Sequence, residues 1–458
     1  VTCDVVVPEG ETLTIEEGVT VRFAEGVGMT CNGTLVAEGT EEDRILFTTL
    51  SPTPLPGDWD NVELYGSSNL ISYVDYEYAT DGFTGDFAGN STFDHIRISS
   101  GLMSLDADGI NLANSTNMTF TNNEIGVAGG YCIRCSNCDF SEFTGNSTSD
   151  ANFGIRADES YYLTIENNVI ENFEEYGIYF RNSPYSKVNH NHLLVLEASG
   201  SLIAIDNAQE NQYAEVNYNY IELHSNEDYR DLRGIEVHDS EIVGDSIIVL
   251  FNHSYHNSGR AIRADRSAIR DNYIRMEDPT TWGDGRSYVI ESYNNDNARG
   301  TIENNRIDAT GQSYGIYATH ADIEYNHLSN WSSGSNEQWA IGYGDNNVIR
   351  YNVVEDFLHG LEVHGSNTTV VGNQIKVRSW GIYSIGGGNQ VIEDNTIEKY
   401  SSNGDWLIYV TNAASVEVKN NECTATGGEG FYFNNTSVEM ERNLIVTPGQ
   451  GLELTNEV

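Results

Sequence analysis

The residues best suited to chemistry lie in one row of short repeated strands near the middle of the chain. Aligning these strands places Glu236, Arg263 and Glu291 at the same outward position of three successive repeats. Equivalent positions on neighbouring parallel strands lie about 4.8 Å apart, so the three side chains should form a ladder of alternating charge. Flanking positions carry three more titratable residues: Asp206, His238 and Asp265. Carboxylates, a histidine and an arginine this close together suit proton transfer or cation binding.

Extra residues in the same repeats should leave the regular strands as loops around this ladder. The repeat spacing widens there to as much as 53 residues, and the excess falls in segments such as HSNEDYRDLRG, HNSGR and MEDPTTWGDGRS. These segments bring five more side chains that suit ligand binding: Arg230, Arg233, Arg260, Trp282 and Arg286. Loops added to a rigid scaffold usually carry function.

A row of tyrosines nearer the C-terminus is a second candidate site. Tyr383, Tyr409 and Tyr432 share one outward position, and Tyr317 lies further up the same row. Stacked aromatic side chains suit sugar rings or a protein partner. Tyrosine is also a favoured residue of exposed strands, so a purely structural role stays open.

Both rows depend on a repeat that fills most of the chain. Thirteen asparagines, mostly 20 to 28 residues apart, stand two positions before an aliphatic or cysteine residue (once a threonine): Asn123, Asn146, Asn168, Asn191, Asn219, Asn272, Asn305, Asn326, Asn352, Asn373, Asn395, Asn421 and Asn443. A strand signal keeps step with them, as in FGIRAD around Ile155 and WGIYSI around Ile382. Such self-similarity indicates a solenoid, because one repeat cannot bury its apolar face alone. We expect the asparagines to point inward and bond to one another, with Asn252 as a degenerate further member of the row.

We therefore predict an all-β fold, a right-handed parallel β-helix of roughly 15 coils. Residues 1–50, where TLTIEEGVTVRFAEG alternates apolar and polar residues, should form a β-rich N-terminal cap. Residues 51–458 should form a single continuous repeat array.

The N-terminal strands, the segment PGDWDNVELYGSSNLISYVDYEYA and the asparagine repeats together resemble the parallel β-helices of the pectate-lyase-like superfamily, including NosD-like and archaeal surface proteins. The resemblance covers nearly the whole chain and is specific for the fold. It is not specific for activity, because this fold hosts lyases, hydrolases, epimerases, adhesins and inert scaffolds.

For a polysaccharide lyase, the resemblance implies Ca²⁺ bound by carboxylates, here Asp206, Glu236 and Asp265. It also implies an arginine that abstracts a proton, here Arg263 or Arg233, with Glu236 and His238 as further catalytic candidates. A hydrolase would instead pair two carboxylates as acid and base. Opposite charges on neighbouring strands also stabilise a sheet without any catalysis, so that interpretation stays open.

The charge of the chain limits its partners. The net charge is -46, and only four of the 23 basic residues are lysines. Such a surface argues against nucleic acid or anionic membranes as partners. It is typical of proteins from saline habitats, where carboxylates keep a surface hydrated. No run of apolar residues is long enough to span a membrane.

The six cysteines predict at most local cross-links. Cys3 and Cys31 lie in neighbouring N-terminal strands and form the most plausible disulfide. Cys132, Cys135 and Cys138 have a metal-like spacing, but no fourth ligand is near in sequence, so a local disulfide or core packing fits them better. Cys423 occupies the apolar slot of its repeat and should be a core thiol.

A surface location would expose several Asn-x-Ser/Thr sequons to glycosylation. Seven are candidate acceptors: Asn32, Asn90, Asn114, Asn117, Asn330, Asn367 and Asn435. Asn146 also has the sequon but belongs to the inward row.

The absence of a complete lyase or glycosidase signature favours an extracellular structural or adhesive β-helix, in a filament or a surface layer. A polysaccharide lyase or hydrolase acting at the charge ladder is the first alternative. A non-catalytic module that binds polysaccharide through the tyrosines and Trp282 is the second. The last strand, GLELTNEV, presents an open edge, so we expect further polypeptide or self-association there.

Overall fold

The computed structural model of the chain describes residues 1–98, 107–126, 129–207, 213–227, 230–252, 258–278, 287–295, 298–311, 313–331, 338–401 and 404–456. The chain divides into two compact units, Val1–Glu222 and Leu223–Val458.

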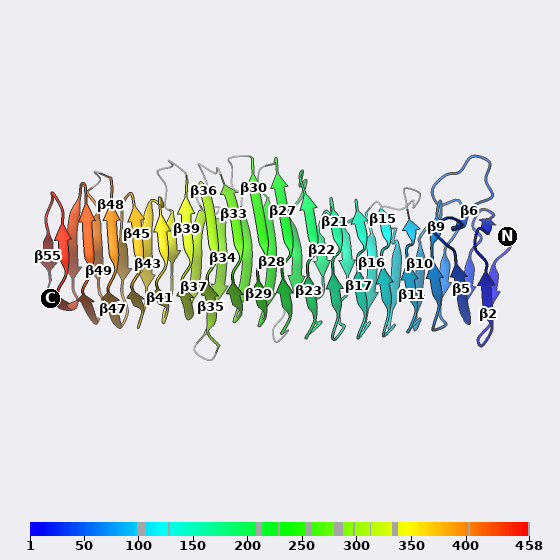
Figure 1. Cartoon of the computed structure of the whole chain (residues 1–458), viewed down its shortest axis with the longest axis horizontal. Helices are drawn as coiled ribbons and strands as arrows, with labels where there is room; N and C mark the ends of the chain where they lie inside the picture. The colour runs from blue at the N-terminus through cyan, green and yellow to red at the C-terminus, as the bar shows by residue number, and fades with distance from the viewer. Residues whose placement is uncertain are drawn as a thin grey trace. The chain divides into compact units, whose positions relative to one another are not determined.

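Three parallel sheets, A, B and C, run through each unit, and each coil contributes one strand to each sheet (Figure 1). The described residues form β-strands and no helix. The predicted right-handed parallel β-helix is therefore confirmed. Residues 1–50 pair in the same way, all in parallel. Here β1 (Val5–Val7) pairs with β4 (Met29–Cys31), β2 (Thr12–Ile15) with β5 (Thr34–Glu38), and β3 (Thr20–Phe23) with β6 (Ile45–Thr49).

Sheet A carries the candidate sites of both units. In unit 1 its strands are β1 (Val5–Val7), β4 (Met29–Cys31), β7 (Val62–Leu64), β10 (Phe83–Asp86), β13 (Ile110–Ala113), β16 (Tyr131–Ser136), β19 (Phe153–Arg156), β22 (Tyr176–Tyr179) and β25 (Leu202–Asn207). In unit 2 they are β28 (Asp231–His238), β31 (Ser258–Asp265), β34 (Ser287–Tyr293), β37 (Ser313–Thr319), β40 (Trp339–Gly342), β43 (His359–His364), β46 (Ile382–Ile385), β49 (Trp406–Thr411), β52 (Glu429–Asn434) and β55 (Leu452–Thr455).

Sheets B and C complete the coils. Sheet B runs from β2 (Thr12–Ile15) to β26 (Glu215–Asn217) in unit 1, and from β29 (Glu241–Val243) to β53 (Ser437–Glu441) in unit 2. Sheet C runs from β3 (Thr20–Phe23) to β24 (His192–Val195) in unit 1, and from β30 (Ser246–Phe251) to β54 (Leu444–Val446) in unit 2. Strand β27 (Tyr220–Ser225) spans the boundary of the two units.

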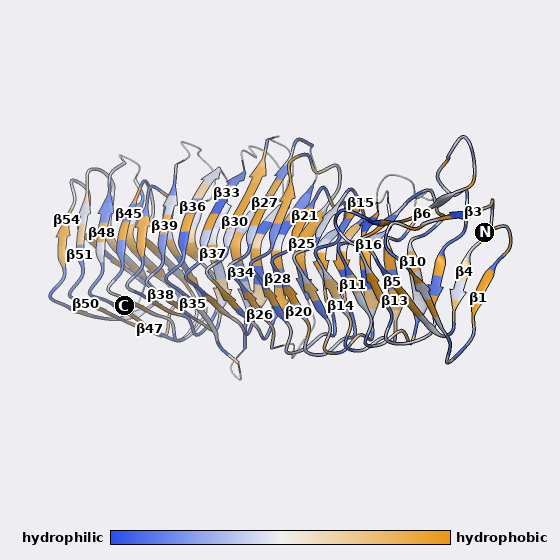
Figure 2. Cartoon of the chain, turned by 45° about the vertical axis from the view of Figure 1, so that its right-hand side comes forward, coloured by the Kyte–Doolittle hydropathy of each residue, from blue (hydrophilic) through white to orange (hydrophobic). Residues whose placement is uncertain are grey.

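Columns of identical or similar apolar side chains fill the interior, and Figure 2 shows hydrophobic residues recurring along the strands. In unit 1, Phe93, Phe120 and Phe143 are in register and fully buried, with ring centroids 5.5 and 4.8 Å apart. In unit 2 the central residue of the strand signal forms one column from Ile235 to Phe431. Removing one such ring would cost about 3–5 kcal/mol, because neighbouring coils cannot close the cavity.

The inward asparagine ladder is confirmed in both units. Asn146 shows the repeated pattern: its backbone N–H and its Nδ2 both donate to Asn168 Oδ1 at 2.9 Å, and Nδ2 also donates to the Phe120 carbonyl at 2.9 Å. The same bonds link Asn373 to Asn395 in unit 2. Asparagine suits the position because one short side chain supplies both an acceptor and two donors.

Asn252 does not belong to this row, contrary to our expectation. It lies on the surface, and its Nδ2 donates to Asn226 Oδ1 at 2.7 Å. Asp245 takes the inward place: it is 1% exposed, and its backbone N–H donates to Asn272 Oδ1 at 2.8 Å. A carboxylate oxygen accepts as an amide oxygen does, so the asparagine pattern alone does not reveal this coil.

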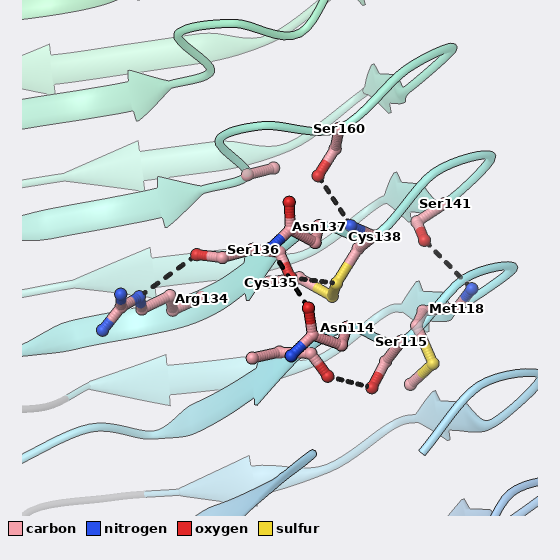
Figure 3. Close-up of a disulfide and its surroundings, with 12 residues drawn as sticks. Asn114, Ser115, Met118, Arg134, Cys135, Ser136, Asn137, Cys138, Ser141 and Ser160 are labelled. Carbon is pink, nitrogen blue, oxygen red and sulfur yellow. Dashed lines mark hydrogen bonds between the residues drawn. A yellow bond between two sulfur atoms is a disulfide. The ribbon is translucent and has the colours of Figure 1, made fainter. Parts of the chain in front are cut away.

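The predicted disulfide between Cys3 and Cys31 is wrong. Cys3 is an exposed free thiol, whereas Cys31 is a buried one that lies between Val7 and Leu64 in an inward column. Cys135 and Cys138 are bonded instead, with Cα atoms 5.8 Å apart, and close the turn after β16 (Figure 3). Cys423 is a fully buried free thiol, as expected.

Candidate functional site

The predicted charge ladder forms on sheet A of unit 2. Glu236 on β28 is in register with Arg263 on β31, which is in register with Glu291 on β34 and then Tyr317 on β37. Asp206, which we expected at a flanking position, is instead in register with Tyr179 on the strand of the preceding coil in unit 1.

Each glutamate of the ladder is held by two arginines. The carboxylate of Glu236, only 5% exposed, accepts hydrogen bonds from Arg263 Nη1 at 3.1 Å and from Arg233 Nη1 at 2.5 Å. Glu291, 3% exposed, pairs with Arg260 and lies 3.7 Å from Arg263 Nε. Arg233 and Arg260 also pair with Asp231 at the start of β28. Buried carboxylates are thus compensated by charge-assisted hydrogen bonds within the sheet.

This pairing opposes the proposed role of Arg233 as a proton abstractor. Burial alone would lower the pKa of its guanidinium, but hydrogen bonds and charge from Asp231 and Glu236 outweigh burial and raise it above its usual value. A base must lose its proton before it can accept one, and these contacts hold the proton in place. Arg263, the other candidate base, points its Nη1 at Glu236.

The described residues do not gather into the predicted calcium site. Among them, no group of three or more His, Cys, Asp or Glu side chains is placed to hold a metal ion. Asp206 in unit 1 is fully buried and bonded to Arg181 at 2.8 Å. In unit 2, Asp265 lies 3.2 Å from His238 Nδ1 and accepts the Tyr293 N–H at 2.7 Å.

The loops around the ladder are only partly described. Trp282 and Arg286, two of the predicted ligand-binding side chains, lie outside the described residues. Arg230 pairs with Glu227 in its own loop. Arg260 lies on β31 itself, so it belongs to the ladder and not to a loop.

The predicted tyrosine row is also real, but its geometry changes its chemistry. The ring centroids of Tyr383 and Tyr409 are 5.2 Å apart, and those of Tyr409 and Tyr432 are 4.7 Å apart, with interplanar angles of 17° and 6°. The faces of these rings therefore largely cover one another, and their edges and hydroxyls face outward. The hydroxyl of Tyr432 accepts a hydrogen bond from Thr455 at 3.0 Å.

A second aromatic row beside the tyrosines escaped the sequence analysis. Trp339 is in register with His359, and Trp380 and Trp406 stand two residues before the paired Ile382 and Ile408. Trp380 meets Tyr383 and Tyr409 edge to face, at 5.0 and 5.2 Å. Together the two rows make an aromatic patch: Trp339, His359, Trp380, Tyr383, Trp406, Tyr409 and Tyr432. The signal is present in the sequence as Trp-x-Ile in three repeats, at WAI, WGI and WLI.

Burial affects the titration of His359 in the aromatic patch. Its ring lies 4.5 Å from that of Trp339. Burial, assisted by Arg378 and opposed by Asp405, lowers the pKa of His359 to about 4. The imidazole is therefore neutral at neutral pH and packs as an aromatic side chain.

Tyr317 belongs to a separate cluster of phenols. Its ring stacks on that of Tyr343 at 4.7 Å and lies 4.8 Å from that of Tyr288. Burial and the neighbouring phenols raise the pKa of Tyr317, so its hydroxyl stays protonated. Tyr293 donates its hydroxyl to Glu291 at 3.2 Å, which joins this cluster to the charge ladder.

Unit 1 contains a groove of about 840 Å³ that the sequence analysis did not predict. It lies between the ends of the sheet C strands and the starts of the sheet A strands, beside the widened coil at residues 196–201. Its lining includes Asp150, Asn172, Glu174, Leu196 and Glu197. Three carboxylates around a partly apolar floor make it unsuitable for an anion.

The predicted glycosylation sites divide by burial. Six of the seven asparagines are exposed: Asn32, Asn90, Asn114, Asn117, Asn367 and Asn435. Asn330 is 1% exposed, so the folded protein does not present it to a transferase. Several exposed members already use Nδ2 in an outer row, as Asn435 does with Asn412 Oδ1 at 2.9 Å.

The chain belongs to the right-handed β-helix family. The family model, described as a right handed beta helix region, matches residues 82–242 and 319–457, more than half of the sequence. No curated protein matches the chain. In the described residues, no helix is long and apolar enough to cross a membrane.

Several solved structures are similar in fold. One is a DFA-IIIase from Arthrobacter chlorophenolicus A6, with 10% identity, 76% of this chain and 85% of that chain covered, and a TM-score of 0.34. Another is a tailspike mutant of E. coli bacteriophage HK620 in complex with a pentasaccharide, with 11% identity, 96% of this chain and 73% of that chain covered, and a TM-score of 0.32. A third is the Streptococcus pneumoniae surface protein and adhesin PfbA, with 11% identity, 99% of this chain and 91% of that chain covered, and a TM-score of 0.22.

Proposed function

We propose that this chain is a non-catalytic β-helix of a cell surface, with a structural or adhesive role. The observation that carries the proposal is the pairing of the buried glutamates. Glu236 and Glu291 are the best acid and base candidates, yet arginines occupy both. An acid–base pair must instead exchange protons with a substrate.

Activity assays test this proposal directly. A panel of neutral and acidic polysaccharides would be incubated with the purified chain, with Ca²⁺ and with a chelator. We expect no new reducing ends and no unsaturated products in any arm. Turnover that disappears in Glu236→Gln would overturn the proposal in favour of a polysaccharide lyase or hydrolase.

Carbohydrate binding through the aromatic patch is a second candidate function. The specific observation is the tryptophan row beside the tyrosines, because indole rings supply the largest contact area of any side chain. We expect Trp380→Ala to weaken binding to glycans by at least about tenfold, as central aromatic residues do in interfaces.

Trp331→Ala provides a matched control for that test. Trp331 is 76% exposed and lies outside the aromatic patch, so its loss removes an indole without changing the patch. Equal binding by both variants on a glycan array would contradict carbohydrate recognition by the patch. An extracellular location in a saline habitat and self-association remain parts of the proposal, and light scattering of the purified chain tests the latter.

A further inference from the structure

Three arginines follow one another on sheet A of unit 1, in a chain that has 23 basic and 69 acidic residues. Arg134 lies on β16 and Arg156 on β19, directly in register, and Arg181 follows β22. Like charges opposite one another on neighbouring strands are destabilising. In unit 2 the ladder alternates glutamate and arginine, whereas here two cations adjoin.

Acidic partners compensate two of the three arginines. Arg156 binds Asp158 through Nε at 2.8 Å and through Nη2 at 3.2 Å. Arg181 binds Asp206 at 2.8 Å. Arg134 differs, because none of the described residues forms an ion pair with it. Within the described part of the chain, its side chain makes one hydrogen bond, from Nε to Ser136 Oγ at 3.4 Å, as Figure 3 shows.

The carboxylate of Asp108 interacts electrostatically with Arg134, but its oxygens accept hydrogen bonds from other donors. They accept the Tyr131 N–H at 3.0 Å and Asn111 Nδ2 at 2.5 Å. Burial raises the pKa of Asp108, while these hydrogen bonds oppose that effect and Arg134 contributes only through its charge. Arg134 is therefore the arginine of this pair that has no ion pair with a described residue.

Aromatic rings hold both guanidinium groups in place. Arg134 and Arg156 lie 5.1 and 5.3 Å from the ring centroid of Tyr131. Arg156 also lies over Tyr179 at 4.9 Å and donates Nη1 to the Tyr131 hydroxyl at 2.9 Å. Stacking on a ring orders a guanidinium and leaves its N–H edge free for a planar anion.

We propose that Arg134 and Arg156, held by Tyr131, form a binding site for an oxyanion, a carboxylate or a sulfate group. Arg134 supplies the free N–H donors, and Arg156 adds positive charge at the adjacent position. The site goes beyond the proposed function, since neither the charge ladder nor the aromatic patch takes part in it.

The surroundings favour a ligand with one anionic group over a polyanion. The acidic groove reaches Asn152, immediately before Phe153 on β19, and would repel further negative charge. The net charge of -46 would do the same at long range. At about 0.15 M salt the Debye length is only about 8 Å, so the local arginines dominate over the distant carboxylates.

Calorimetric titrations of the full chain test the site, with sodium sulfate against sodium chloride at matched ionic strength. Two further arms, acetate and a uronic acid against its neutral parent sugar, separate a free anion from one carried on a sugar. We expect the chain to bind sulfate more tightly than chloride. We expect Arg134→Gln to weaken sulfate binding at least about tenfold, because a charge-assisted contact is lost.

Arg97→Gln in the same unit is the matched control. Arg97 is 54% exposed and lies 3.4 Å from Glu124, so the variant changes the net charge equally without touching the site. Circular dichroism would confirm that both variants fold. The proposal would be overturned if both variants lost affinity equally or if Arg134→Gln bound as tightly as the parent chain. It would also be overturned if none of the oxyanions bound more tightly than chloride.

Discussion

Glu291 shows how a single residue of the charge ladder contributes to stability. Its carboxylate is 3% exposed and balances Arg260 and Arg263. Glu291→Gln would leave two partly buried guanidinium groups without their shared counter-charge, at a cost of about 3 kcal/mol. Urea denaturation would measure the loss.

The control for that variant is Glu355→Gln. Glu355 pairs with His327 where both side chains are 48% exposed, so we expect a change within about 0.5 kcal/mol. If both variants unfolded at the same urea concentration as the parent chain, the ladder would contribute nothing to stability.

His359 gives the chain a pH-dependent stability. Its pKa is about 4 in the folded chain, below the ordinary value of 6.5, because burial disfavours the charged ring. The unfolded chain therefore binds more protons between these two values, and stability falls as the pH falls from 6.5 towards 4. We expect a loss of about 2 kcal/mol between pH 7 and pH 5 from this residue.

His359→Gln isolates that contribution. The variant has no titrating side chain at this place, so its unfolding midpoint should change less between pH 7 and pH 5 than that of the parent. The same pH profile in both chains would show that His359 is solvated in the folded protein.

The asparagine ladder is the element that joins successive coils. Asn168→Ala would remove donors to Asn191 and Phe143, and would deprive Asn146 of its acceptor. We expect a loss of roughly 3 kcal/mol, because several buried polar groups become unsatisfied together.

Asn189→Ala is a suitable comparison in the adjacent coil. Asn189 lies half-buried on the outward face, and its Nδ2 donates to Glu166 at 3.2 Å. A small effect there and a large one at Asn168 would separate the inward row from other asparagines. Similar effects in guanidinium titrations would contradict a special role for the inward row.

The turn after β16 is fixed by the disulfide between Cys135 and Cys138. The loop that it closes is short, so the chain-entropy model gives a contribution of only about 2 kcal/mol. The double variant Cys135→Ala/Cys138→Ala should therefore fold with a modestly lower melting temperature. Failure to fold would show that the cross-link directs folding and does more than restrict the unfolded chain.

At the scale of the whole molecule, the net charge determines how stability depends on salt. A net charge of -46 opposes compaction by self-repulsion, which salt screens. We expect the melting temperature to rise steadily as NaCl increases from about 0.01 M, where the Debye length is about 30 Å, to about 1 M. A melting temperature that is constant or falls with salt would contradict an adaptation to saline habitats.

The sequence by itself determined the fold and the register of its rows. Spacings of asparagine and of the central isoleucine sufficed, because each coil must place these residues above those of the coil before it. That constraint brought Glu236, Arg263 and Glu291 together correctly, and it also brought Tyr383, Tyr409 and Tyr432 together. It missed Asp245 and misplaced Asp206, where the repeat pattern is irregular.

Only the tertiary structure decided what those rows do. Pairing depends on side-chain direction and on neighbours from three coils, so the occupation of Glu236 and Glu291 by arginines could not be read from spacing. The same holds for the stacking of the tyrosine faces and for the lack of an ion pair between Arg134 and any described residue. A repeat specifies which residues are neighbours, whereas the directions of their side chains decide which of them bind one another and which are left for a ligand.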